Sequence, residues 1–242
     1  NFFIAFNEYA EVKFNNEKKI LNIINKNWKG RSIVYKSQIN DWKIYFSDKT
    51  NLAITTDEII FDKDNLTGCL TIVDSTLNNT QLYLENSKCE DSVNFIRSKG
   101  MIDKIEINNS LKDSLDGDFS NLKFQEIKVN GSYNDCVDFS RGSYEIKYLY
   151  LNSCGDKGVS IGEKSKVKLF DVNIDNSNIG IASKDSSETM IIKSKIKDTK
   201  FCVVAYNKKQ EFFGSKVTLK DTICENALVE YDYDNLSMIK IQ

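Results

Sequence analysis

The sequence predicts an all-β solenoid, a parallel β-helix with about 22 residues per coil. Small residues recur every 22 residues, and each is followed by an aliphatic residue. Short stretches such as "IDKIEI" and "FQEIKV" alternate apolar and polar residues, which is the pattern of strands. A repeat of this length without a helix is typical of one coil of a β-helix. The small residues are Ser92, Ser114, Cys136, Gly158, Gly180 and Cys202.

Asparagines repeat with the same spacing. A stacked amide can hydrogen-bond to the next coil and to the turn backbone, so this column indicates a repeated turn. The asparagines of this column are Asn86, Asn108, Asn130 and Asn152.

The first 50 residues lack the repeat and predict an N-terminal cap made of strands plus an amphipathic helix. The apolar side chains at 20, 21, 23, 24 and 28 fit one helical face, and Gly30 fits a helix end. Such a helix would cover the open end of the solenoid. Residues 51–242 are the predicted β-helix domain, and the stretch "NKKQEFFG" is an inserted loop.

Five stacked segments resemble a known family: "CEDSVNFIRSKG", "KDSLDGDFSN", "NDCVDFSRG", "CGDKGVSIGEKS" and "NIGIASKDSS". They look like the single-stranded right-handed parallel β-helices of the pectin-lyase-like superfamily, over roughly residues 60–230. That superfamily includes lyases, hydrolases, epimerases, tailspikes and proteins without known activity, so the resemblance specifies the fold more than the function. Its polygalacturonases carry a histidine motif that this sequence cannot supply. Its pectate and alginate lyases use Arg or Lys as base, often with calcium, but no complete motif aligns.

Composition excludes several function classes. The chain has 242 residues, no histidine and a net charge of −2. Without histidine, Ser-His-Asp catalysis and His-ligated zinc are impossible. The net charge argues against nucleic-acid binding, and no apolar run is long enough for membrane insertion. No signal peptide is apparent, and the missing initiator Met suggests a mature form or part of a larger polypeptide. A bacterial, secreted or cell-surface protein is expected.

The six cysteines are expected to be small core or stacking residues rather than disulfides. Cys136 and Cys202 share one column three coils apart, or about 14 Å at the strand spacing. That distance is beyond the reach of a disulfide. Cys89 and Cys154 are similarly separated.

Alternation along the repeated strand predicts which side chains point outward. The small residues should form an outward floor for an extended ligand, bordered by acids and then by bases. Asp116 and Asp138 should lie one coil apart at roughly 5 Å, where like charges resist joint ionisation. This spacing would suit a glycosidase pair.

The candidate site follows from these columns. Asp116 and Asp138 are predicted to shuttle protons or hold a metal, with Lys157, Arg141 or Lys184 as base or carboxylate clamp. Asp113 and Asp135 are candidate ligands of an optional Ca²⁺. The competing interpretation is that the aspartates only shape turns and that the ion pairs are surface contacts. The candidate substrate-binding residues are Glu163, Asp185, Tyr206 and Lys208.

Two functions are therefore predicted. The first is a carbohydrate-active enzyme of lyase, hydrolase or epimerase type that acts on an acidic polysaccharide at the outer face. The alternative is a non-catalytic glycan-binding, adhesin or tailspike-like module, in which the solenoid is a rigid docking surface.

Overall fold

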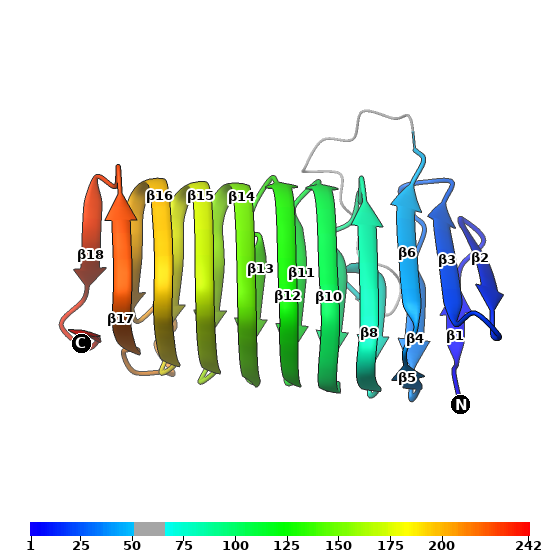
Figure 1. The fold of residues 1–242 in the computed structure, drawn as a ribbon, viewed down its shortest axis with the longest axis horizontal. Coiled ribbons are helices and arrows are strands. Elements are labelled where there is room, and N and C mark those ends of the chain that lie inside the picture. Colours follow the sequence, from blue (N-terminus) through cyan, green and yellow to red (C-terminus); the bar gives the residue numbers. More distant parts are fainter. Residues whose placement is uncertain (51–65) are drawn as a thin grey trace.

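A computed structural model describes residues 1–50 and 66–242 as an elongated, right-handed β-solenoid of about nine turns. Figure 1 shows the strands stacked side by side along the long axis, with the two termini at opposite ends. The parallel β-helix predicted from the 22-residue spacing is therefore confirmed. Its pairings are parallel throughout the central coils, and the antiparallel pairs β1–β4 and β2–β3 lie at the N-terminal end.

The described residues form nineteen strands. Their bounds are β1 Ile4–Phe6, β2 Ala10–Asn15, β3 Ile20–Asn25, β4 Ser32–Tyr35, β5 Gln38–Asn40, β6 Lys43–Asp48, β7 Gly68–Val73, β8 Thr76–Glu85, β9 Asp91–Ile96, β10 Lys99–Ser110, β11 Asp113–Asp118, β12 Asn121–Ser132, β13 Val137–Ser140, β14 Ser143–Gly162, β15 Lys166–Lys184, β16 Glu188–Tyr206, β17 Lys216–Glu225, β18 Val229–Tyr233 and β19 Met238–Ile241.

The repeat is expressed as a strict register between neighbouring coils. Val93, Leu115, Val137 and Val159 are successive partners in the sheet, and all four are fully buried. Each aliphatic residue therefore packs against its counterparts one coil above and one coil below. Burial of such a continuous column, at about 25 cal/mol per Å² of apolar surface, is the main stabilisation of a solenoid.

The predicted capping helix is wrong, because the described residues contain no helix and hence no helix that could cross a membrane. The segment Ile20–Asn25 is strand β3, which pairs antiparallel with β2 and parallel with β6. Its alternate residues Leu21 and Ile23 point into the core. β-branched isoleucines favour a strand, and a short apolar run fits either period.

The coil corners are columns of residues with positive φ. One column follows the predicted asparagine ladder by one residue and uses Asn109, Gly131, Ser153 and Asn176, with φ between 59° and 82°. Asn and Gly tolerate this left-handed conformation better than most residues. In the ladder itself, the amide of Asn152 donates to Asn130 Oδ1 at 2.8 Å. Asn130 and Asn152 of the ladder therefore join neighbouring turns as expected.

All six cysteines form disulfides, which contradicts the expectation that they are only small core residues. The pairs are Cys69–Cys89, Cys136–Cys154 and Cys202–Cys224. Residues in one column are indeed too far apart, but each disulfide joins two different columns that meet inside a corner. The Cα atoms of Cys136 and Cys154 are 5.4 Å apart, within ordinary disulfide reach.

The column of small residues points inward, so the predicted outward floor is wrong. Ser92, Ser114 and Cys136 are fully buried. The burial pattern of β11 shows why, since Ser114 and Leu115 are buried in succession where the strand enters from its corner. Alternation with an outward Asp116 begins only after these two residues.

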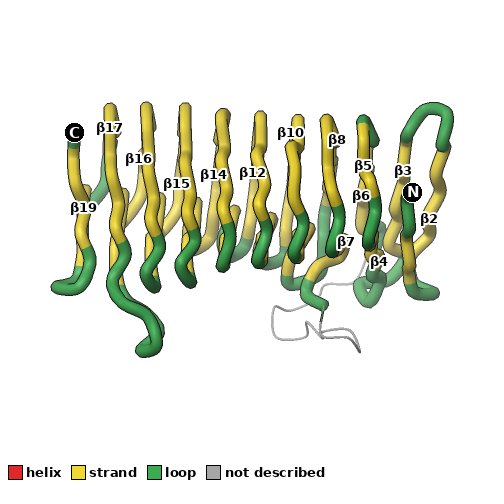
Figure 2. Tube along the Cα trace, turned by 90° about the horizontal axis from the view of Figure 1, so that it is seen from below, coloured by secondary structure: helices red, strands yellow, loops and turns green. Residues whose placement is uncertain are grey.

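The stretch containing "NKKQEFFG" forms the longer connection between β16 and β17, which Figure 2 shows extending beyond the other coil corners. Asp185 anchors this loop, since its Oδ1 accepts hydrogen bonds from the backbone N–H groups of Lys208 and Lys209 at 2.7 and 2.8 Å. The side chain of Phe212 is buried beneath the loop. The predicted inserted loop is therefore present and fixed to the solenoid.

Candidate active site

The repeated strand formed by β9, β11, β13 and the end of β14 points a column of polar side chains away from the apolar core, and Asn94 and Ser160 in that column are buried. In-register pairing places Asn94, Asp116, Asp138 and Ser160 next to one another on four successive coils. We call these four residues the acidic row. Adjacent strands are about 4.8 Å apart, so Asp116 and Asp138 are neighbours, as predicted.

Asp116 is held in an environment that favours its neutral form. Burial, followed by the charges of Asp91 and Asp118, raises the pKa of Asp116 well above its ordinary value. The amide of Asn94 donates to Asp116 Oδ2 at 3.0 Å. A carboxyl that is desolvated and surrounded by other acids keeps its proton to higher pH. Asp116 can therefore supply a proton under mildly acidic conditions.

Asp138 differs from its neighbours in having an uncommitted carboxylate. Its side chain takes part in no hydrogen bond or ion pair with the described residues, and its Oδ1 is buried without a partner. A second unpartnered atom lies in the same row two coils away, because the Oδ1 of the buried Asn94 also has no partner among the described residues. A buried polar atom without a partner lowers the stability of the fold. Such atoms are therefore rare in proteins, and a functional role is a common reason for keeping one.

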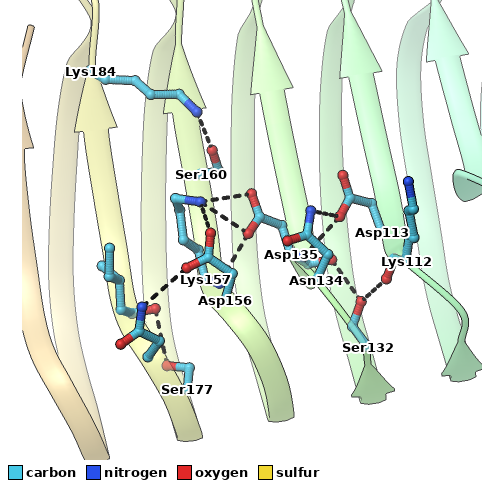
Figure 3. Close-up of polar contacts among 12 residues, drawn as sticks. Lys112, Asp113, Ser132, Asn134, Asp135, Asp156, Lys157, Ser160, Ser177 and Lys184 are labelled. Carbon is cyan, nitrogen blue, oxygen red and sulfur yellow. Dashed lines mark hydrogen bonds and ion pairs between the residues drawn. The ribbon is translucent and has the colours of Figure 1, made fainter. Parts of the chain in front are cut away.

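Asp113 and Asp135 form a second column that ties each coil to the next (Figure 3). Asp113 Oδ1 accepts from the backbone N–H of Asp135 at 2.8 Å and from the Asn134 amide at 2.7 Å. Asp135 Oδ1 accepts from the backbone N–H of Lys157 at 3.0 Å. Burial is the main cause that raises the pKa of Asp113 to about 7 and that of Asp135 to about 6. These contacts match the turn-shaping interpretation.

Lys157 lies against carboxylates on both sides. Its ammonium is 3.3 Å from Asp135 Oδ1 and also bonds to Asp156. Burial alone would lower the pKa of Lys157, but Asp135 and Asp156 outweigh it and raise the pKa. A lysine base needs a lowered pKa, so this geometry suits a permanent positive charge instead.

Lys184 of β15 extends onto the adjacent coil, where its ammonium reaches the acidic row. Its ammonium donates to Ser160 Oγ at 2.6 Å, and the side chain is buried (Figure 3). The path passes over Gly162, where an added Cβ would lie 3.0 Å from Lys184 Cε. Gly162 therefore leaves the space that brings a cation next to the row.

The remaining predicted residues separate into three sets. Arg141 and Glu163 form an exposed ion pair at 2.7 Å, and Lys209 from the β16–β17 loop joins Glu163. Asp185 and Lys208 belong to the anchor of that loop, with Asp185 fully buried. Tyr206 pairs in register with Lys184. It lines a hollow of about 390 Å³ that is formed by residues of β15, β16 and β18.

The described residues do not bring three or more acidic ligands together in an arrangement suited to a metal ion. One oxygen of each carboxylate, Oδ1 of Asp113 and Oδ1 of Asp135, instead accepts a backbone N–H group, and Asp135 also contacts the Lys157 ammonium. The donor set does not fit calcium there, and no step of the chemistry is assigned to a metal.

With this geometry in place, known proteins supply a comparison of fold only. The chain is similar in structure to the catalytic domain of GH87 α-1,3-glucanase in complex with nigerose, with a TM-score of 0.36 and 8% identity. The match covers 84% of this chain and 54% of that chain, so this chain spans about half of its length. The D1069A form of the same domain matches with a TM-score of 0.31 and 6% identity over the same shares. No family model and no curated protein sequence matches.

Sequence reasoning placed Asn94 and Ser160 in the outward column but did not select them as site residues. It also missed Gly162 as the passage for Lys184 and Asp156 as a partner of Lys157. The signal was available, because each lies 22 residues from an equivalent polar or small position. Only side-chain geometry shows which of these positions touch.

Proposed function

We propose that this protein is a carbohydrate-active β-helix protein that hydrolyses a polysaccharide along the acidic row. The observation that carries the proposal is the in-register pair Asp116 and Asp138, which project outward from mid-strand on adjacent coils. Asp is disfavoured within strands, so two adjacent ones need a compensating use. A carboxyl with a raised pKa beside a second carboxyl is the arrangement that glycoside hydrolysis uses.

The two residues take different roles in this mechanism. Asp116, whose pKa is raised, donates a proton to the leaving glycosidic oxygen. Asp138, whose carboxylate no described residue engages, supports the opposite side of the sugar ring. Neighbouring strands hold side chains about 5 Å apart, which is the separation of a retaining pair rather than the wider inverting one.

The acidic polysaccharide predicted from the sequence fits this surface when the pH is mildly acidic. Lys157 and Lys184 offer positive charge at one end, but the aspartates would repel a uronate chain when ionised. The raised pKa values of Asp113 and Asp135, about 7 and 6, leave these groups largely neutral in mild acid. We therefore propose that a uronate polymer is processed at mildly acidic pH and that Lys184 faces its carboxylate.

Turnover on a polysaccharide panel tests the proposal. The purified protein is incubated with neutral and uronate polymers, and new reducing ends and unsaturated products are measured separately. Asp116→Asn and Asp138→Asn should each lower the rate by about 10²-fold or more. Asp171→Asn is the matched control, because Asp171 has positive φ, pairs with Lys193 alone among the described residues, and lies away from the row. Equal loss in all three variants, or no product from any polymer, contradicts the proposal.

One observation favours the alternative, a non-catalytic glycan-binding module. Asp113 and Asp135 are committed to the backbone of the next coil, as in a purely structural ladder. In that case a glycan array would show binding without products, and Asp138→Asn would leave the affinity unchanged. The same panel and variant therefore distinguish the two functions.

A further inference from the structure

A second hollow lies on a different face of the solenoid. Its volume is about 590 Å³, and it follows the outer surface of β12, β14, β15, β16 and β17 just after the corner that ends the acidic face. Two parallel columns of outward side chains form its walls. The charged residues among them are Lys123, Lys166, Lys168, Lys216, Glu145 and Glu188. We call this hollow the basic groove.

The lysines of the basic groove are poorly neutralised. Lys123 is 3.9 Å from Glu145, while no ion pair among the described residues includes Lys166, Lys168 or Lys216. Lys166 and Lys216 lie one coil to either side of Glu188, so one carboxylate stands between two cations.

Nearby lysines on another face behave differently. Lys193, Lys195 and Lys197 of β16 each have a carboxylate oxygen within 2.6 to 2.8 Å. These lysines of β16 are therefore matched by carboxylates, whereas the groove lysines Lys166 and Lys168 of β15 and Lys216 of β17 have no ion pair among the described residues. The groove holds four lysines and two glutamates, and this excess of positive charge favours an anionic ligand.

The spacing of these cations suits a linear polymer. Lys166 and Lys216 are two coils apart, as are Lys123 and Lys168, so both pairs repeat at about 10 Å. Another hollow, of about 540 Å³, adjoins the basic groove. It shares Asn121, Ser143 and Lys166 with the groove and extends it to the corner. A long, straight, regularly charged ligand would contact every coil along this path.

We propose that the basic groove is a docking site for a linear anionic polysaccharide carrying carboxylate or sulfate groups. The site is separate from the acidic row and holds whether or not that row is catalytic. The groove lies on another face from the aspartates, so a polyanion bound there avoids their repulsion.

Binding at neutral pH tests the site. Fluorescently labelled polygalacturonate oligomers and dextran sulfate are titrated with the protein, and neutral dextran is the uncharged comparison. The triple variant Lys166→Gln/Lys168→Gln/Lys216→Gln should bind about tenfold more weakly, since three exposed charge contacts are lost. Affinity of the unaltered protein should fall as salt is raised. Which of the two anionic probes binds more tightly identifies the acid group.

The matched control removes the same charge elsewhere. Lys18→Gln/Lys29→Gln/Lys43→Gln deletes three exposed lysines at the N-terminal end and should leave the affinity within twofold. Asp116→Asn should also bind normally, although it abolishes turnover if the proposed function is correct. Equal weakening in both triple variants, equal binding of neutral dextran, tighter binding of duplex DNA, or no binding overturns the docking site.

Discussion

The hydroxyls of Ser92 and Ser110 meet at 2.6 Å in the place that Cys136 and Cys154 occupy two coils later. Both pairs are separated by 18 residues, and both lie in the buried corner between the same two columns. The corner can therefore hold either a hydrogen bond or a covalent bond between adjacent strands.

A fourth disulfide is expected at this corner. The double variant Ser92→Cys/Ser110→Cys should oxidise spontaneously and raise the free energy of unfolding by up to about 3 kcal/mol, the value for a loop of similar length. Thiol titration under denaturing conditions and urea unfolding check this. Free thiols in the folded, oxidised protein would show that the two corners differ in geometry.

The reverse change should destabilise the protein. Cys136→Ser/Cys154→Ser recreates the serine pair but loses the cross-link, and a decrease of about 2–3 kcal/mol in the free energy of unfolding is expected. The measurement is urea unfolding without reductant. In the presence of reductant, the free energies of unfolding of the variant and the parent should converge. A difference that persists would assign the effect to packing at this corner.

Stability should depend on pH in an unusual direction. Asp113 and Asp135 have pKa values raised by burial to about 7 and 6, so between about pH 4 and 7 the folded chain binds more protons than the unfolded chain. The free energy of unfolding should therefore fall as pH rises through this window, by on the order of 2 kcal/mol. Asp113→Asn should flatten the profile, as measured by urea unfolding at several pH values. A profile that rises with pH in both proteins would contradict the assignment.

Substitution of two glycines should affect stability to very different extents. At Gly142 an added Cβ would lie 2.3 Å from the carbonyl oxygen of Ser120 and 2.5 Å from the Tyr144 hydroxyl. Gly142→Ala should cost about 3 kcal/mol or more, because backbone and a buried ring must shift. Gly131 has a φ of 82° and stands in the corner column that Asn109 and Asn176 also occupy. Gly131→Asn should change stability by less than about 1 kcal/mol, and thermal unfolding of both variants tests the contrast.

The repeat made the register predictable, but not the direction of every side chain. Asp116 and Asp138 were correctly placed as outward neighbours because alternation holds there. Ser92 and Cys136 were misplaced because two successive residues turn inward at the corner, which the two-residue period cannot represent. The disulfides were missed for another reason, since the cysteines compared were about three coils apart, whereas each bond joins two cysteines 18 to 22 residues apart.

The N-terminal error has a different physical origin. Ile20, Leu21, Ile23 and Ile24 fit a helical face as well as a strand when considered alone. What decides between them is the open edge of β6, which pairs with all six residues of β3. Long-range pairing of this kind carries no local signal, and neither does the hydrogen bond from Lys184 to Ser160 on the adjacent coil.

The three disulfides also give the protein a mechanical character. Their loops span 20, 18 and 22 residues at positions near the start, middle and end of the described coils. If the chain were pulled from its ends, each loop would withhold about 60 to 80 Å of contour length that only reduction could release. Coils between the bridges could peel away one by one, while the bridged coils would act as stops. The maximum extension of the pulled chain is therefore set by whether the three disulfides are oxidised or reduced.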